Sequence, residues 1–576
     1  MTTHRAAAVA GALVVTVALA GVAGAAAPRL FFTDLESGPA SGGQDGLGVF
    51  VTLYGEGLGT SQASSTVTFG GQEVARYVSW GEGAGPRGLD RIVVQPGPAV
   101  TSGPIVVTMR GETSDALPFT VRAGDVYFVA LNGSDQAAGT FQEPWRTVVH
   151  AREQLQPGDV AFIRHGVTQT AEDAYGAALS IEASGAPGLP KALVAYPGAV
   201  ATIGSTALEF GIRVPNNGQA TTDWVVAGLR LRGLVAALAV EGSGPRRWRV
   251  VGNDISCPQG DGQTGCFVVS LGEEIAFLGN QVHDISQSGP QPSKQYHAVY
   301  FTTDTNHVEV GWNHIHDNRT CRAIQFHSSP LCIPECGELD TTGFNQHHLE
   351  VHHNLIHGDV CDGIVFATVD PDQGPVRAYD NVIYGVGAGP SPPDGDANYA
   401  GIYVPGSTNT GPDGTGSVEV LHNTLVDCGA ADGVPAGNVD RGAFGRGPGC
   451  PALFLDLVDN IVVALGDEPF MEPSSATALI TGSHNLWDGA DVAPPYLTDN
   501  LEADPLFVNL VGRDFRLRYG SPAINSGVDA SIADDFRGAS RPQESGFDRG
   551  AYELVPPIFD DDFESATTDY WSAVVN

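Results

Sequence analysis

The stretch VHHNLIHGD, residues 351–359, decides the fold of this chain. An alternating apolar run ends in Asn and continues with an aliphatic residue, often followed by His or Tyr. This phrase occurs seven times, at intervals of 27 to 42 residues. Its central residues are Asn253, Asn280, Asn313, Asn354, Asn381, Asn423 and Asn460. A repeat of this period is typical of a solenoid in which each repeat forms one coil.

A second strand is predicted between successive Asn phrases. These runs are short, rich in β-branched and aromatic residues, and bounded by turn-forming residues. They are FVVSL from residue 267, HAVYF from 297, RAIQF from 322, DGIVF from 362 and AGIYV from 400. Because parallel strands of neighbouring coils lie about 4.8 Å apart, we expect the Asn side chains to stack. An inward Asn at a bend can hydrogen-bond both the turn backbone and its neighbours, which is a structural role.

From Asp125 to Asn485 the chain resembles the right-handed parallel β-helix, or pectate-lyase-like, superfamily. This resemblance predicts an all-β solenoid over residues 123–495. The segment TVVHAREQL, residues 147–155, is predicted to form a short amphipathic helix that covers the open end of the first coil. A fold of this kind hosts many functions, so the resemblance does not identify a reaction.

Two flanking segments have signatures of their own. Residues 28–122 alternate short strands with Gly turns, as in VTLYGEGLG and VTFGGQEV, and resemble the IPT/TIG immunoglobulin-like β-sandwich. Residues 496–555 resemble the choice-of-anchor segment, type Q, of secreted bacterial β-helix proteins. The tail, 556–576, resembles an exported-protein motif, IF-x-DGFES, although Asp561 and Asp562 stand where it has Asp-Gly.

Residues 1–27 have a basic start, an apolar stretch and a small-residue end, which predicts a secretory signal peptide. No later apolar run approaches the length of a membrane span. We therefore expect a secreted or cell-surface protein and a monomer. In an exported chain eight cysteines favour disulfides. The candidate pairs are Cys257 with Cys266, Cys332 with Cys336, Cys428 with Cys450, and Cys321 with Cys361.

The strongly negative net charge of the chain limits which macromolecules it can bind. A net charge of -37, with 29 Lys and Arg against 66 Asp and Glu, argues against a nucleic-acid partner. The excess of carboxylates on loops is compatible with bound Ca²⁺, although no run matches a calcium loop. An extracellular polysaccharide is the expected partner, held by a local cluster of basic residues.

Aligning the second strands brings a set of polar residues together. His297, Arg322 and Asp362 occupy one position on consecutive coils. Since side chains alternate along a strand, Tyr300 and Gln325 should point outward, and His327 should do so one step further. Lys294 and Tyr296 enter the same region from the preceding loop.

These residue types suit a polysaccharide lyase that cleaves uronate-containing glycans by β-elimination. In this hypothesis Arg322 neutralises the uronate carboxylate, Lys294 or His327 abstracts the proton, and Tyr300 protonates the leaving oxygen. The residues expected to bind substrate are Tyr296, His297, Gln325 and Asp362.

Two other functions stay open. A glycoside hydrolase would need facing carboxylates, for which Asp304, Asp362 and Asp370 are the candidates. A non-catalytic surface protein would use the β-helix as a rod and the sandwich to bind glycan or protein.

We interpret most of the clustered histidines as structural residues rather than as metal ligands. His283, His316, His357 and Tyr384 each follow a repeat Asn by three residues, so they should stack as a ladder. His352 and His353, beside His347 and His348, could chelate a metal, but no spacing supports a defined zinc site.

Overall fold

The computed structural model describes residues 27–555, apart from residues 82, 84, 289, 330, 334–337, 341–344, 396, 408–412 and 435–439. Residues 1–26 of the expected signal peptide and the tail, 556–576, lie outside the described residues. So does Cys336, and with it the expected Cys332–Cys336 pair.

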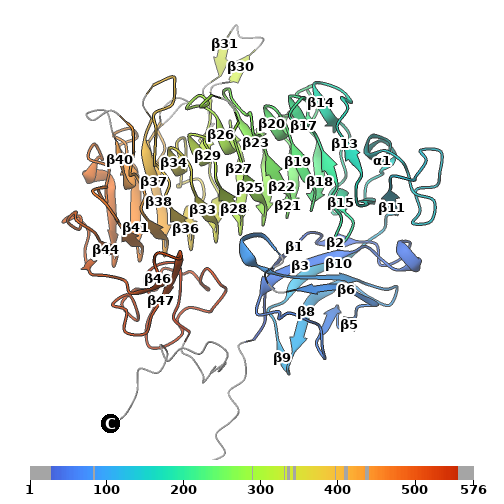
Figure 1. The fold of residues 1–576 in the computed structure, drawn as a ribbon, viewed down its shortest axis with the longest axis horizontal. Coiled ribbons are helices and arrows are strands. Elements are labelled where there is room, and N and C mark those ends of the chain that lie inside the picture. The colour runs from blue at the N-terminus through green and yellow to red at the C-terminus, as the bar shows by residue number, and fades with distance from the viewer. Residues whose placement is uncertain are drawn as a thin grey trace, which may run out of the picture.

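From β11 to β45 the chain winds into a parallel β-helix with three sheets (Figure 1). The first sheet contains β11 (Val126–Val129), β12 (Val160–Ile163), β15 (Lys191–Ala195), β18 (Thr222–Ala227), β21 (Arg246–Val251), β24 (Glu273–Leu278), β27 (Asn306–Gly311), β32 (Leu349–His352), β35 (Val376–Tyr379), β38 (Gly416–Leu421), β41 (Leu453–Val458) and β43 (Ile480–Ser483). The second contains β13 (Thr168–Gln169), β16 (Thr202–Ile203), β19 (Arg230–Arg232), β22 (Asp254–Ser256), β25 (Gln281–His283), β28 (His314–His316), β33 (Leu355–His357), β36 (Val382–Tyr384), β39 (Thr424–Val426), β42 (Ile461–Val463), β44 (Leu486–Asp488) and β45 (Leu501–Glu502). The third contains β14 (Ala177–Ser180), β17 (Phe210–Val214), β20 (Ala236–Val240), β23 (Gly265–Ser270), β26 (His297–Thr302), β29 (Arg322–His327), β34 (Asp362–Phe366), β37 (Tyr399–Val404) and β40 (Arg441–Arg446). The expected all-β parallel solenoid is confirmed.

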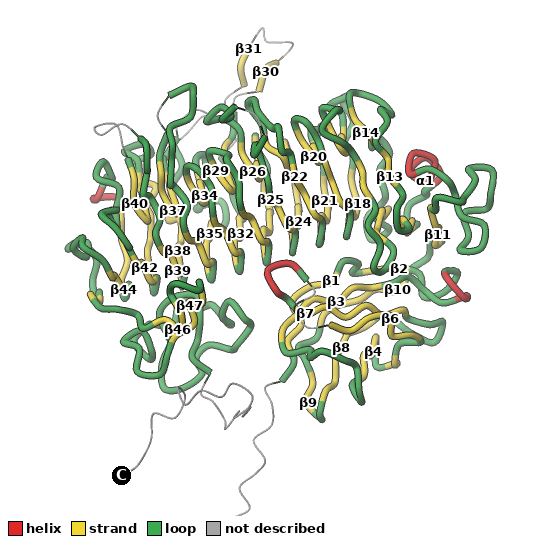
Figure 2. Tube along the Cα trace, in the orientation of Figure 1, coloured by secondary structure: helices red, strands yellow, loops and turns green. Residues whose placement is uncertain are grey.

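The remaining elements flank these sheets (Figure 2). One sheet of the N-terminal sandwich contains β1 (Arg29–Thr33), β3 (Val51–Glu56), β6 (Arg76–Gly81) and β7 (Asp90–Gln95). The other contains β2 (Ser37–Gly38), β4 (Thr66–Phe69), β5 (Gln72–Glu73), β8 (Gly103–Met109), β9 (Glu112–Thr113) and β10 (Leu117–Val121). Two hairpins pair β30 (Leu331–Ile333) with β31 (Glu338–Asp340) and β46 (Phe507–Asn509) with β47 (Asp514–Leu517). Helix α1 covers Val148–Gln154, and short 3-10 helices cover Gln44–Gly46, Pro86–Gly88 and Thr477–Leu479.

The expected cap helix is confirmed. In α1 the Thr147 side chain accepts a hydrogen bond from the His150 backbone N–H, which caps the first turn. Val148 and Ala151 face the solenoid core together with Trp145. Within the described residues no helix is long and apolar enough to cross a membrane.

The Asn ladder lies at the corner between the first and second sheets. Each Asn accepts from the Asn of the preceding coil and donates to the Asn of the following coil. The Oδ1 of Asn354 accepts from the backbone N–H and the Nδ2 of Asn313 at 3.0 and 2.9 Å. Its Nδ2 donates to the carbonyl of Val310 at 2.8 Å and to Oδ1 of Asn381 at 3.0 Å. The predicted seven-residue ladder is confirmed and continues one coil further, to Asn485.

The left-handed residue at this corner is the one before the Asn, not the Asn itself. It has φ between 48° and 64° in all eight coils: Gly252, Gly279, Trp312, His353, Asp380, His422, Asp459 and His484. Gly, Asn, Asp and His tolerate this conformation better than most residues, which explains most of these choices. Trp312 instead packs its ring against Phe31 of the sandwich, with 5.6 Å between centroids.

The sandwich packs on the outward face of the first sheet. One continuous apolar core joins sandwich residues such as Phe50 and Val51 to outward residues of β11, β12, β15, β18, β21 and β24. Phe50 meets Phe162 edge-on at 5.2 Å between centroids. The first half of the first sheet is therefore buried on both faces.

The C-terminal segment packs on the outward face of the second sheet. Val426, Ile461 and Leu486 form a core with Phe507 and Phe515 of the segment. Arg541 inserts into this corner and is fully buried, where it pairs with Asp380 at 2.6 Å and Glu553 at 2.9 Å. Among the described residues, neither flanking core includes a residue of the third sheet. Figure 1 shows both flanking parts on the same side of the solenoid.

Two of the predicted disulfides are formed, Cys257–Cys266 and Cys321–Cys361. The predicted Cys428–Cys450 pair is wrong, because both thiols are buried and free. Cys428 lies in the core below the second sheet, where its Sγ is 3.7 Å from the Ile383 carbonyl, while Cys450 reaches toward Ser407.

The ladder predicts that removal of one amide side chain lowers the stability of the protein. Asn354→Ala would leave the N–H of Asn313 and the carbonyl of Val310 without partners in a dry core. We expect the free energy of unfolding to fall by about 3 kcal/mol. Urea denaturation followed by circular dichroism measures this, with Asn132→Ala, an exposed residue, as the control. Equal midpoints for the two variants would contradict the structural role of the ladder.

Candidate functional site

The strand register of the third sheet agrees with the sequence alignment of the coils. His297 pairs with Arg322, and Arg322 pairs with Asp362, across β26, β29 and β34. Tyr300 pairs with Gln325, and Thr302 with His327. The inward positions of these strands are filled by a column of Phe rings, Phe301, Phe326 and Phe366, stacked at 5.0 and 5.3 Å. The outward residues are thereby held on a rigid surface.

Arg322 is held in place by a buried carboxylate. Its Nε donates to Oδ2 of Asp362 at 3.1 Å, and its Nη1 donates to the Lys294 carbonyl at 3.3 Å. Asp362 is fully buried, and its second oxygen accepts from the Ala400 backbone N–H at 2.9 Å. The disulfide Cys321–Cys361 joins the residues immediately before this pair. Asp362 is therefore a positioning residue for Arg322; direct contact with a substrate, as expected from the sequence, is not compatible with its burial.

Tyr300 and His327 lie together beside this pair. The Tyr300 hydroxyl is 3.4 Å from Nδ1 of His327, and the His297 ring meets the Tyr300 ring edge-on at 4.8 Å. Burial raises the pKa of Tyr300. Burial, with a contribution from Arg322, lowers the pKa of His327 to about 4. Near neutral pH the site thus holds a protonated phenol next to a neutral imidazole.

Two buried polar atoms in the site have no hydrogen-bond partner among the described residues. They are Nδ1 of His297 and Oε1 of Gln325. Their residues are 2% and 6% exposed. In the Asn ladder, by contrast, the amide groups are bonded. A buried polar atom without a partner costs free energy, so such atoms mark a place where water or a ligand group completes the bonding.

Two other predicted residues are placed differently from the expectation. Tyr296 is fully buried, and its hydroxyl donates to the Val235 carbonyl at 2.6 Å. The prediction that Tyr296 binds substrate is therefore wrong: its ring belongs to the solenoid core. Lys294 is half-buried, its backbone N–H donates to Asp394 at 2.9 Å, and its side chain ends beside Gly395. It belongs to the rim of the site, with the loop before β37.

The three-carboxylate grouping of the hydrolase hypothesis is not formed. Asp304 accepts from Nδ2 of Asn306 at 2.9 Å in a turn. Asp370 accepts from the backbone and hydroxyl of Thr415 at 3.0 and 2.9 Å. Both carboxylates stabilise loops.

Glu472 is the site residue that the sequence analysis missed. Its backbone N–H donates to the Phe444 carbonyl at 2.8 Å, so it continues the third sheet beyond β40. Its side chain lies across Gly445, where a β-carbon would overlap the carboxyl group. Its Oε1 accepts from Nδ2 of Asn398 at 3.2 Å. Burial, and then the charge of Asp362, raise the pKa of Glu472 to about 9, so the carboxyl is protonated at neutral pH.

A polar hollow of about 330 Å³ continues the site along the third sheet. Tyr300 and Thr302 form one end of it, and the Arg213–Glu241 ion pair, at 3.3 Å, lines the other. Gln263, Thr264, Ser270 and Ser329 supply amide and hydroxyl groups between them. Such groups are suited to hydrogen bonding with sugar hydroxyls.

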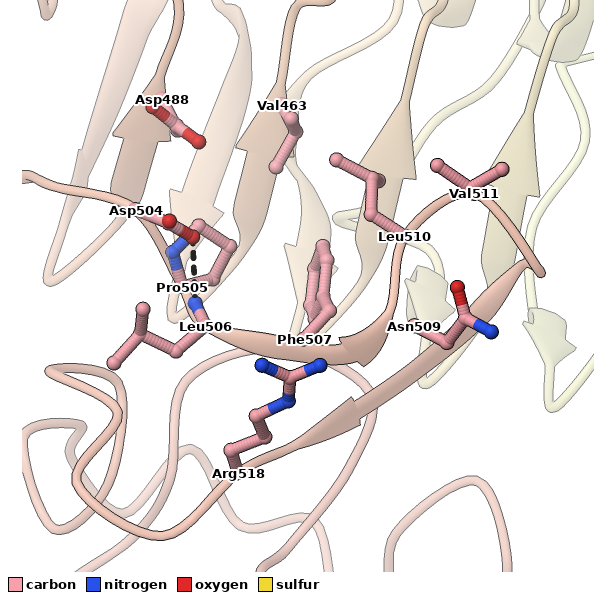
Figure 3. A pocket seen from close by; sticks show the side chains of 10 residues that line it. All are labelled: Val463, Asp488, Asp504, Pro505, Leu506, Phe507, Asn509, Leu510, Val511 and Arg518. Atoms are coloured by element: carbon pink, nitrogen blue, oxygen red, sulfur yellow. Dashed lines mark hydrogen bonds between the residues drawn. The ribbon is translucent and has the colours of Figure 1, made fainter. Parts of the chain in front are cut away.

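Figure 3 shows a second hollow, of about 300 Å³, between the C-terminal segment and the second sheet. Its lining is mainly apolar and includes Val463, Leu506 and Phe507. Asp504 accepts from the Leu506 backbone N–H at 2.7 Å and so closes a turn. Asp488 and Asp504 line the same hollow together with Arg518, and burial, then the charge of Asp504, raises the pKa of Asp488.

The predicted aromatic ladder on the second sheet is confirmed. The rings of His283, His316, His357 and Tyr384 stack in that order, at 5.4, 5.4 and 4.6 Å between centroids. His352 and His353 are buried against the sandwich and the C-terminal segment, where Nε2 of His353 contacts the Asp535 carbonyl at 2.9 Å. They do not join His347 and His348 in one cluster.

Comparison with known proteins identifies one part of the chain. Residues 33–121 match the IPT/TIG domain family. A curated relative, the uncharacterized protein YwoF of Bacillus subtilis (strain 168), is 38% identical over 68 residues, which is 12% of this chain and 13% of that protein. The chain thus spans only a small part of this relative's length.

Solved structures with a similar trace include the pectate lyase Pel9A, at 15% identity and a TM-score of 0.42, which covers 75% of this chain and 96% of its own. XylC in complex with xylose has 10% identity and a TM-score of 0.40, and the coverage is 66% and 86%. These similarities concern the trace of the chain only.

The raised pKa of Glu472 predicts a pH-dependent stability. Between pH 4.5, its ordinary pKa, and about 9 the unfolded chain loses this proton while the folded protein keeps it. Stability therefore falls as pH rises through this window. Glu472→Gln removes this pH dependence. The free energy of unfolding of the variant minus that of the wild type should therefore increase by about 1 kcal/mol for each pH unit between pH 5 and 8. Denaturation at several pH values measures this, with the exposed Glu143→Gln as control; parallel curves for Glu472→Gln and the wild type would contradict it.

Proposed function

We propose that the outward face of the third sheet, over β26, β29 and β34, binds an acidic polysaccharide and cleaves it by β-elimination at a uronate residue. One observation carries this proposal. Arg322, fixed by the buried Asp362, lies with a neutral imidazole and a protonated phenol on a sheet that, among the described residues, neither flanking core includes. In a chain with a net charge of -37, such a cation is a local anion site.

The reaction assigns one role to each group. Arg322 pairs with the uronate carboxylate, which makes the C5 proton easier to remove. His327 accepts that proton, the C4–O bond breaks as the C4–C5 double bond forms, and Tyr300 donates its proton to the leaving oxygen. The incoming carboxylate offsets the charge of Arg322 at His327, so the imidazole becomes more basic when substrate binds. Lys294, on the rim, is the alternative base.

Gln263, Thr264 and Thr302, which line the polar hollow beside Tyr300, would hydrogen-bond sugar hydroxyls. The polar hollow beside Tyr300 would hold the neighbouring sugar. This arrangement supports recognition of a polymer rather than a single sugar, because the site and the hollow follow the same strands.

A second candidate reaction, hydrolysis of a glycoside, is favoured by one observation. Glu472 is a protonated carboxyl beside the site, which is the form that a general acid needs. Elimination gives an unsaturated product, whereas hydrolysis gives only a saturated reducing end, so product analysis separates the two.

We also propose that the protein is exported. The two disulfides support a protein that folds in an oxidising environment. We expect export through the N-terminal segment and release or retention at the cell surface, with the IPT/TIG sandwich as a spacer or an additional binding module. If the protein is a non-catalytic surface protein instead, it will bind glycan without any product.

Incubation with a panel of uronate polymers tests the activity, with the ultraviolet absorbance of the unsaturated product as the signal. We expect Arg322→Ala and Tyr300→Phe to lower the rate by on the order of 100-fold or more. Tyr384→Phe, a ladder residue on the second sheet, is the matched control and should retain full activity.

Unchanged rates in the Arg322 and Tyr300 variants would overturn this site. Saturated products that disappear in Glu472→Gln would favour hydrolysis. Binding without turnover across the panel, with and without Ca²⁺, would favour the non-catalytic function.

A further inference from the structure

The second sheet carries a histidine cluster that the aromatic ladder does not fully explain. His314, His316 and His357 lie on the outward face of the adjacent strands β28 and β33, where His316 pairs with His357. One ring nitrogen from each residue lies within 4.8 Å of the others. His314 is not a member of the ladder, yet its ring packs against His316 at 4.1 Å between centroids.

The tautomer of His316 is fixed by its neighbours. Its Nδ1 contacts Oδ2 of Asp317 at 2.8 Å, which places the proton on Nδ1. The Nε2 atom then carries the lone pair and accepts from the Gln281 amide nitrogen at 3.0 Å, a hydrogen bond that an ion at Nε2 would replace. A carboxylate that orients a histidine through its other nitrogen is the usual second partner of a metal-binding imidazole.

His314 and His357 approach each other through the same kind of atom. Their Nε2 atoms are 3.1 Å apart. Two nitrogens bound to one tetrahedral ion at about 2.1 Å each are separated by roughly 3.4 Å. The Nε2 atoms of His314 and His357 therefore already have nearly the separation that a shared ion requires. Burial and the neighbouring imidazoles lower the pKa of His314 to about 3 and that of His357 to about 4, and both rings are therefore neutral.

We propose that His314, His316 and His357 bind a divalent transition-metal ion through their Nε2 atoms, with Asp317 orienting His316. Three imidazoles suit Zn²⁺, Co²⁺ or Ni²⁺, whereas Ca²⁺ prefers oxygen ligands. Such an ion would clamp the coil of β28 to the coil of β33, on the sheet adjacent to the proposed sugar site. This binding does not depend on the proposed function.

A second histidine group provides the control. His307, His347 and His348 also gather at one corner of the first sheet. There Nδ1 of His307 contacts Oε1 of Glu273 at 2.5 Å, and the Nδ1 atoms of His347 and His348 are only 2.7 Å apart. Two nitrogens this close cannot both bind one ion without moving, so this group is the less suitable of the two.

Titration of the full mature chain, without a polyhistidine tag, with Co²⁺ and with Zn²⁺ tests the proposal. We expect one saturable site, with visible Co²⁺ absorption of a nitrogen-rich site that Zn²⁺ displaces. His357→Phe keeps a ring in the ladder but removes a ligand, and should weaken binding at least tenfold. Asp317→Asn should weaken it about tenfold through His316. His348→Ala should leave it unchanged.

Absence of saturable binding in the wild type would overturn the proposal. Binding that survives His357→Phe, or that is lost in His348→Ala, would also overturn it. Circular dichroism and the melting temperature of each variant without metal separate lost binding from lost folding.

Discussion

The structure depends on one repeated corner. In eight coils, from Gly252 to Asn485, a single left-handed residue bends the chain between the first and second sheets, and the following Asn hydrogen-bonds the neighbouring coils. A lone coil could not bury these amides, because each one is bonded only when its neighbours are present. The ladder therefore fixes the register of all three sheets, including the third sheet, which carries no Asn ladder of its own.

This register explains why the sequence predicted which residues of the candidate site pair across the strands. Once the coils were aligned on their Asn residues, the pairing of His297, Arg322 and Asp362 followed from strand alternation. Strand alternation did not predict which outward residues are buried, because their burial depends on how the loops pack over the sheet. Asp362 and Tyr296 were therefore expected at the surface, whereas one supports Arg322 and the other fills the core.

Glu472 could not be found in this way. It reaches the site from beyond β40, outside the phrase that aligns the coils, and it depends on the small residue Gly445 beneath it. The covering of the first and second sheets was equally hidden, since it arises from contacts between residues more than a hundred positions apart, such as Phe50 with Phe162 and Arg541 with Asp380. Within the part of the chain that the structure describes, neither cover reaches the third sheet, where outward side chains such as Gln325 and Asp362 are nevertheless buried.

We propose that the third sheet holds the sugar, with Arg322 on its carboxylate. A crystal structure of the Tyr300→Phe variant soaked with a uronate oligosaccharide tests it most directly. We expect the carboxylate within hydrogen-bond distance of the Arg322 guanidinium and a neighbouring sugar in the polar hollow lined by Tyr300 and Thr302. An oligosaccharide bound on the sandwich, or in the apolar hollow beside Phe507, with the third sheet empty, would contradict it.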